Sequence, residues 1–98
     1  MPPTYEMLDD IEYDWMRLTP SQREQFRIAR AQMIADLRSG EGFRKGLRVK
    51  GVKGAPGVFE MTWAPDGRAT FSFGREQRQG EVHIVWRRIG THDIFTRP

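Results

Sequence analysis

Three short stretches in the second half of the chain alternate apolar and polar side chains. Such alternation places one kind of side chain on each face of a β-sheet. It runs through "VFEMTW" and "RATFSF", which the turn sequence "APDG" joins as a hairpin, and it returns after Val82. The expected sheet has one polar face and one apolar face that a second layer must cover. The apolar positions are Phe59, Met61, Trp63, Ala69, Phe71, Phe73, Val82, Ile84 and Trp86.

The first half of the chain predicts two helices that can supply this layer. Leu8, Ile11, Trp15 and Leu18 recur at helical spacing. The run "LTPSQREQF" then begins a second helix, with Thr19 as N-cap, a proline in the first turn and a glutamine that completes a capping box. Its apolar face continues through Phe26, Ala29, Met33 and Leu37, and "RSG" ends it.

The predicted fold is α+β, with an N-terminal αα-hairpin packed on one face of a small twisted antiparallel sheet. Residues 1–98 form a single domain, because a chain of this length can bury only one core. Between the helices and the hairpin, the glycine-rich residues 40–58 predict mobile loops around at most a short strand at Leu47 to Val49. The opening residues MPPTYEML show no obvious strand.

Composition narrows the chemistry. The chain has no cysteine, which rules out disulfides, thiolate zinc sites and a cysteine nucleophile, and two histidines make a poor metal set. We expect neither a metal nor a cofactor. No apolar run has membrane-spanning length, and the N-terminus is acidic where a signal peptide would be basic, so we expect a cytoplasmic protein.

Charge is unevenly distributed along the chain. Residues 1–40 have a balance of −2 and residues 41–98 a balance of +5, which makes the second half a candidate surface for a polyanion. The alternative is that these cations only keep a small domain soluble. The candidate phosphate or RNA contacts are Arg44, Arg48, Lys50, Lys53 and Arg88. The glycine-rich stretch that holds most of them can equally be a solvated connection.

The polar face of the predicted sheet gathers groups suited to phosphodiester cleavage. It carries Glu60, Arg68, His83 and Arg87, with His92 at its rim. Cleavage without a metal needs a base for a 2′-hydroxyl proton, an acid for the leaving 5′-oxygen and cations for the charge on phosphorus. The alternative is a solvated face whose Glu and Arg pair across strands.

Four stretches together resemble the RelE/ParE superfamily of toxins from bacterial type II toxin–antitoxin systems. They are "LTPSQREQFRIARAQM", "RVKGVKGAPGVFEMTW", "DGRATFSFG" and "VWRRIGTHDIF", and the resemblance covers roughly residues 9–95. It implies two helices against a twisted antiparallel sheet (a RelE-like fold). It also implies an endoribonuclease, an mRNA interferase that cleaves mRNA, often on the ribosome, and leaves a 2′,3′-cyclic phosphate.

The resemblance assigns roles to several residues. Arg68 falls at or next to the arginine that holds the scissile phosphate, and His92 falls on the basic or imidazole residue beyond the last strand, preceded by Arg87 and Arg88. One branch of the superfamily has paired lysines at the positions where this chain has Glu60 and Thr62. The same branch uses a C-terminal tyrosine, and this chain has Phe95 near that position. Another branch uses carboxylate and histidine, which fits Glu60 with His92.

Two other functions are compatible with the sequence. A toxin of the same fold can poison gyrase without doing chemistry, and a protein of this fold can bind RNA or regulate without catalysis. Histidines beside arginines favour the nuclease over the gyrase poison. For any toxin of this kind we expect a separately encoded acidic antitoxin, with carboxylates for Arg87, Arg88 and the basic loop, and apolar side chains for a groove along the helices or the sheet edge.

Overall fold

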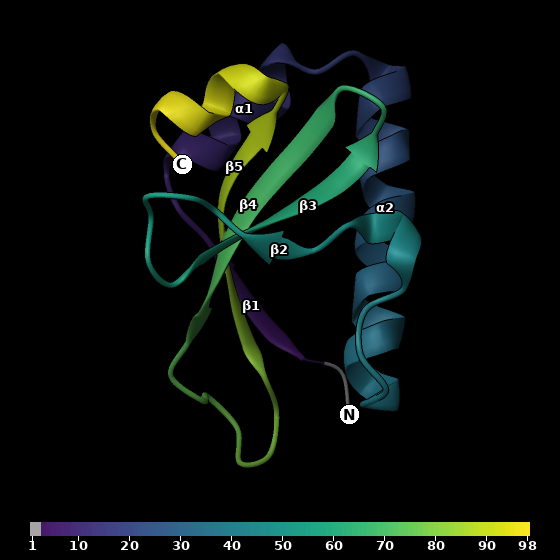
Figure 1. Ribbon diagram of the computed structural model, residues 1–98, viewed down its shortest axis with the longest axis vertical. Helices are drawn as coiled ribbons and strands as arrows, with labels where there is room; N and C mark the ends of the chain where they lie inside the picture. Colours follow the sequence, from purple (N-terminus) through teal and green to yellow (C-terminus); the bar gives the residue numbers. More distant parts are fainter. Residues whose placement is uncertain (1–2) are drawn as a thin grey trace.

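In the computed structural model, which describes residues 3–98, two α-helices pack against a five-stranded sheet (Figure 1). Helix α2 packs against β3, and α1 packs against β5. The predicted α+β architecture is confirmed. The elements are β1 (Thr4–Met7), α1 (Asp10–Arg17), α2 (Pro20–Ser39), the 3-10 helix η1 (Lys45–Leu47), β2 (Lys50–Gly51), β3 (Val58–Ala64), β4 (Gly67–Gly74), β5 (His83–Gly90) and the 3-10 helix η2 (His92–Thr96).

Helix α2 starts and stops where the sequence predicts. The Thr19 hydroxyl accepts a hydrogen bond from the Gln22 amide at 3.1 Å, and the Gln22 side chain accepts one from the Thr19 amide at 2.8 Å. This reciprocal pair is a capping box, which satisfies two amides that the helix itself leaves unbonded. Gly40 ends the helix in the left-handed region, with φ of 71°.

The sheet differs from the prediction in one strand. Its order is β1-β5-β4-β3-β2, and β1 pairs in parallel with β5, so the sheet is mixed where a purely antiparallel one was expected. The sequence showed no obvious strand in MPPTYEML, yet Thr4–Met7 form β1. The four residues of β1 are too few to show a recognisable alternation of apolar and polar side chains. The position of this edge strand is instead determined by its pairing with β5.

The glycine-rich segment also differs. Leu47 ends the short helix η1 and is buried against the core, and Arg48 takes a left-handed conformation with φ of 49°. An extended run at Leu47 to Val49 is therefore interrupted, and the strand begins later, at Lys50. Burial of a single leucine determined the local structure here.

Aromatic rings fill the core between the helices and the sheet. The Phe26 ring on α2 meets the Trp86 ring on β5 edge-on at 5.4 Å, and Phe71 on β4 lies 5.6 Å from the same tryptophan. Three residues predicted on apolar faces are partly exposed. Phe73 is 46% exposed, Leu8, which precedes α1, is 38% exposed, and Val82, which precedes β5, is 38% exposed.

A β-bulge in β5 changes which side chains share the polar face. Thr70 pairs with Arg88 while Phe71 pairs with Trp86, so Arg87 is an extra residue in β5. Because a bulge adds one residue to the alternation, Arg87 and Arg88 both lie on the polar face and the next residue returns to the core.

Within residues 3–98, no helix combines the length and apolar character needed to cross a membrane.

Candidate active site

The β3–β4 turn and the segment after β5 meet at one end of the sheet. There the Nδ1 atom of His92 lies 3.1 Å from the Oδ1 atom of Asp66. Both side chains are open to solvent, at 62% and 75% exposure, and the Phe95 ring lies 5.8 Å from the imidazole. An imidazole paired with a carboxylate is therefore presented to any molecule that approaches this end.

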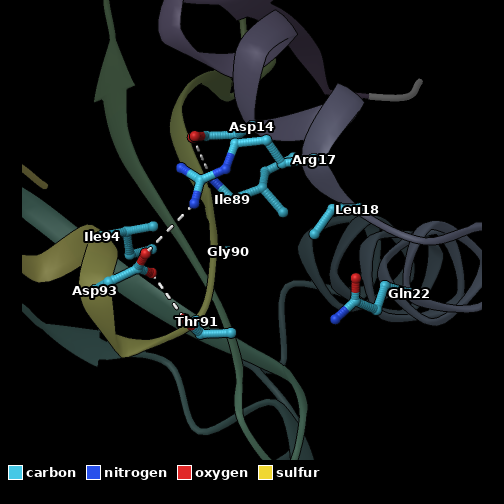
Figure 2. A pocket seen from close by; sticks show the side chains of 9 residues that line it. All are labelled: Asp14, Arg17, Leu18, Gln22, Ile89, Gly90, Thr91, Asp93 and Ile94. Carbon is cyan, nitrogen blue, oxygen red and sulfur yellow. Dashed lines mark hydrogen bonds and ion pairs between the residues drawn. The ribbon is translucent and has the colours of Figure 1, made fainter.

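The backbone around His92 is anchored on both sides. The Thr91 hydroxyl donates to Asp93 at 2.7 Å, and Arg17 of α1 lies 3.9 Å from the same carboxylate (Figure 2). The Thr91 hydrogen bond, with Arg17 nearby, lowers the pKa of Asp93. Ile94 is buried, and a Cβ atom on Gly90 would lie 2.8 Å from its side chain, so glycine lets η2 fold back tightly. These contacts fix the position of His92.

Arg68 places a cation in the turn that carries Asp66. Its Nη1 atom donates to three main-chain oxygens of that turn, at 2.9 to 3.3 Å, which belong to Ala64, Pro65 and Gly67. The Trp63 indole nitrogen in turn donates to the Arg68 main-chain oxygen at 2.9 Å. The sequence-predicted pair of Arg68 and His92 thus lies at the same end of the sheet.

Sequence reasoning assigned Asp66 only to turn formation, as part of "APDG". A carboxylate beside Nδ1 favours the tautomer that carries its proton there, which leaves Nε2 to exchange a proton with a substrate. This is the arrangement expected of a general acid or base. The sequence feature that could have revealed this pair is that Asp66 and His92 each come two residues after a strand, β3 and β5, and that both strands end at the same end of the sheet.

Glu60 and Arg87 lie farther down the polar face. Glu60 is opposite Thr70 across the β3–β4 pair, and the Lys50 ammonium group lies 3.8 Å from its carboxylate. Arg87 donates through Nε to the Pro98 main-chain oxygen at 3.1 Å. The centre of the face therefore carries one carboxylate and cations, next to the end that holds the imidazole.

His83 lies apart from this cluster. Its ring is buried, with Nδ1 2.7 Å from the Thr4 hydroxyl and Nε2 3.0 Å from the Glu6 carboxylate. It stands at the start of β5, seven residues or about 23 Å from Gly90. A Cβ atom on Gly74 would lie 2.7 Å from the ring. His83 therefore connects β1 to β5 in this structure and is not brought together with His92.

The predicted basic contacts fall into two groups. Arg44 is held by the Asp36 carboxylate at 2.9 Å, and Arg88 by that of Asp14 at 2.8 Å. The Arg44 hydrogen bonds lower the pKa of Asp36. The Asp14 carboxylate also accepts a hydrogen bond from the Ile89 amide at 2.9 Å (Figure 2). The pairing of β1 with β5 ends at Trp86, so β1 does not bond this amide. Arg48, Lys50 and Lys53 are exposed.

Among residues 3–98, no three His, Asp or Glu side chains come together as a metal site would require. The described site instead combines an imidazole, carboxylates and guanidinium groups on one face of a sheet. Groups of this kind can move protons and stabilise a negatively charged phosphate.

Solved structures define the class of fold. A chain of the Escherichia coli DinJ–YafQ toxin–antitoxin complex superposes with a TM-score of 0.66 at 12% identity, over 95% of this chain and 96% of that one. YafQ from E. coli strain BL21(DE3) gives a TM-score of 0.63 at 11% identity, over 93% and 94%. A chain of the RelB–RelE antitoxin–toxin complex from Methanococcus jannaschii gives 0.60 at 11%, over 92% and 93%.

The protein therefore shares its α+β fold with chains solved in toxin–antitoxin complexes. More particularly, its fold is that of the RelE/YafQ-type toxins, as the sequence resemblance implied. No protein-family model and no curated protein sequence matches the chain. At 11–14% identity the likeness concerns the fold, and activity must be argued from the residues.

Proposed function

We propose that the protein is the toxin of a type II toxin–antitoxin system and acts as a metal-independent endoribonuclease on mRNA. The observation that carries this proposal is the solvent-facing pair of His92, at the start of η2, and Asp66, in the β3–β4 turn, which lie 3.1 Å apart beside the Arg68 side chain bound to the same turn. Structural likeness to YafQ and to a chain of a RelB–RelE complex supports it.

In the proposed reaction, a 2′-hydroxyl of RNA attacks the adjacent phosphorus. The base removes the hydroxyl proton, the new P–O bond forms as the bond to the 5′-oxygen breaks, and the acid protonates that oxygen. The products are a 2′,3′-cyclic phosphate and a 5′-hydroxyl. His92 acts as general acid or base, oriented by Asp66, and Glu60 is the second proton-transfer candidate. Arg68 and Arg87 stabilise the charge on phosphorus.

Exposed lysines extend this site toward the RNA backbone. Lys50 on β2 and Lys53 in the following loop stand at the edge of the sheet beside β3, with Arg48 nearby in sequence. They supply attraction to phosphates without reading sequence. Ribosomal RNA offers the same backbone chemistry, so this edge is also where we propose contact with the ribosome. His83 remains a more remote candidate, because it is buried.

The proposal includes a separately encoded acidic antitoxin. The balance of +5 over residues 41–98 favours carboxylates at the polar face. An apolar cavity of about 210 Å³ lies between α2 and the β1–β5 edge, and its lining includes Met33, Leu37 and Trp86. Arg30 also lines this cavity and can bind a carboxylate of the antitoxin. An amphipathic acidic segment matches both features.

The experiment is to expose purified protein to free single-stranded RNA, with and without EDTA, and to translating ribosomes in magnesium buffer, and to map the new 5′-ends. A ribonuclease of the proposed kind produces 5′-hydroxyl and cyclic phosphate ends, and on free RNA it does so in the presence of EDTA. Replacing the 2′-hydroxyl at the cleaved nucleotide by hydrogen should stop cleavage there. Intact RNA with inhibited gyrase supercoiling would identify a gyrase poison instead, and intact RNA that is bound would identify a non-catalytic protein.

A further inference from the structure

A groove of about 320 Å³ lies between α2 and the β3–β4 turn, and we call it the α2 groove. On the helix side its lining includes Gln25, Ile28 and Gln32, which form one stripe because positions i, i+3 and i+7 of a helix share a face. On the sheet side its lining includes Trp63 and Pro65, and residues of η1 also line it. Figure 1 shows the β3–β4 turn and η1 beside α2, so three separate parts of the chain meet here.

The lining of the α2 groove is uncharged. Although 30% of the chain's residues are charged, none of the described residues that line this groove is. Leu47 and Trp63 contribute buried apolar surface, whereas Ile28 is 53% exposed and Pro65 is exposed as well. Two uncovered apolar side chains, one on the helix and one on the turn, therefore border a neutral hollow. Such a hollow suits the flat, uncharged part of a ligand.

Cations stand at the rim of this hollow. Lys45 begins η1 and Arg48 follows its end, both are exposed, and the two residues between them line the groove. A neutral hollow with cations beside it matches a nucleotide, which joins a flat, uncharged base to an anionic phosphate.

The α2 groove also adjoins the candidate active site. Ala64 and Pro65 line the groove, and their main-chain oxygens accept hydrogen bonds from the Arg68 guanidinium at 3.2 and 3.3 Å. The Trp63 indole, which lines the groove as well, donates to the Arg68 main-chain oxygen at 2.9 Å. One wall of the groove is thus the turn that carries Asp66. RNA that reaches the candidate active site can place a neighbouring base in the groove.

We propose that the α2 groove binds a nucleobase close to the cleaved phosphodiester, and that Gln25, Ile28 and Gln32 determine base specificity. This inference rests on the proposed function for the identity of the ligand as RNA. The base lies between Ile28 and Pro65, as bases held outside a helix lie between apolar side chains. Each glutamine amide offers a donor and an acceptor to the edge of the base.

The test measures what a single base adds to the binding of a bare backbone. The first probe is a short, fluorescein-labelled oligomer of abasic tetrahydrofuran nucleotides, which keeps the phosphates and has neither bases nor 2′-hydroxyls. Four further probes carry one 2′-O-methyl nucleotide at the centre, each with a different base. Fluorescence anisotropy should show that at least one base raises the affinity of the unaltered protein about fivefold or more. If no base raises it, the proposal is overturned, and this is the result expected if the groove receives an acidic peptide instead.

A substitution in the groove locates the base. Ile28→Ala should remove most of the gain in affinity and leave the affinity for the fully abasic oligomer unchanged. Alanine is the best helix former, so the exposed position on α2 tolerates it. The matched control Met16→Ala removes an exposed apolar side chain from α1 and should keep the gain. A gain that persists in Ile28→Ala would place the base elsewhere and refute the groove.

A second variant tests the two amides. Gln25→Leu with Gln32→Leu should keep a gain from a base, because the apolar contacts remain, and should reduce the differences in affinity among the four bases. Differences that persist in this variant, or equal gains from all four bases in the unaltered protein, would contradict the role of the amides.

Cleavage of an all-ribose RNA that contains all four bases separates this inference from the proposed function. A base-dependent gain that Ile28→Ala removes, with no cleavage by any variant, supports the base site and contradicts the ribonuclease. Cleavage together with a gain that Ile28→Ala retains supports the ribonuclease and contradicts the base site.

Discussion

The Asp66 carboxylate lies 3.1 Å from the His92 imidazole, although 26 positions separate the two residues in the chain. The β3–β4 turn and the backbone after β5 create this proximity, and both are fixed by contacts of their own. If Asp66 orients the imidazole for proton transfer, then its neutral amide analogue should impair chemistry while the fold remains unchanged.

Asp66→Asn should therefore lower the rate of RNA cleavage by about 10- to 100-fold. Single-turnover cleavage at saturating protein measures this loss apart from binding. The control Glu76→Gln removes an exposed carboxylate from the β4–β5 loop and should leave the rate unchanged. An Asp66→Asn variant as fast as the unaltered protein would mean that the contact between Asp66 and His92 is only structural.

His92→Ala and Arg68→Ala should each reduce cleavage on the order of 10² or more, because one removes the proton-transfer group and the other a cation near phosphorus. Both should also relieve growth inhibition in a host that expresses the protein. Arg75→Ala, which removes an exposed arginine beyond β4, is the matched control for charge. Full toxicity of both site variants would contradict the assignment.

Asp14→Ala should destabilise the fold by about 3–5 kcal/mol, because it leaves the Arg88 guanidinium and the Ile89 amide without their buried acceptor. Urea denaturation measures the free energy of unfolding. Glu12→Ala, at an exposed position of the same helix, should change it little. A loss for Asp14→Ala no larger than for Glu12→Ala would show that this ion pair contributes nothing net.

Asp36 should add stability that depends on pH. Its pKa is lowered in the folded state from 3.8 by the Arg44 hydrogen bonds, so its contribution is present above about pH 4 and is lost as pH falls through the lower folded value. Asp36→Asn should lower the melting temperature at pH 7, and the difference from the unaltered protein should disappear in acid. A difference that is independent of pH would contradict this linkage.

Lys50→Gln with Lys53→Gln should weaken RNA binding and reduce the slope of log affinity against log salt by about one unit for each charge removed. Arg44→Gln serves as the comparison, because its guanidinium is already paired with Asp36 at the end of α2. It should change the slope less. An unaltered slope in the double variant would make the β2 loop a simple connection.

The sequence predicts those parts of the fold that repeat a local pattern. The capping box at Thr19 and the alternation through Met61 and Phe71 are local, so the long helix and the β3–β4 hairpin follow from them. Strand β1 depends on pairing with residues about 80 positions away, and the start of β2 depends on where Leu47 is buried. Neither dependence is visible in a short window of sequence.

The candidate site was predicted in its residue types and only partly in its geometry. Alternation assigned Glu60, Arg68 and Arg87 to one face, and the strand ends brought His92 close to Arg68. The same alternation assigned His83 to that face without showing that Thr4 and Glu6 would enclose it. The bulge at Arg87 and the partner Asp66 come from pairing between strands, which periodicity does not encode.

Pairing of Thr4 with His83 joins the first described strand of the sheet to its last. During synthesis from the N-terminus, β1 must wait for β5, and the polar face also lacks Arg87 and His92 until then. Contacts of such high sequence separation form late in folding. A nascent chain therefore cannot assemble the proposed catalytic groups before nearly all of these residues have left the ribosome, so chains that are still being synthesised lack the proposed activity.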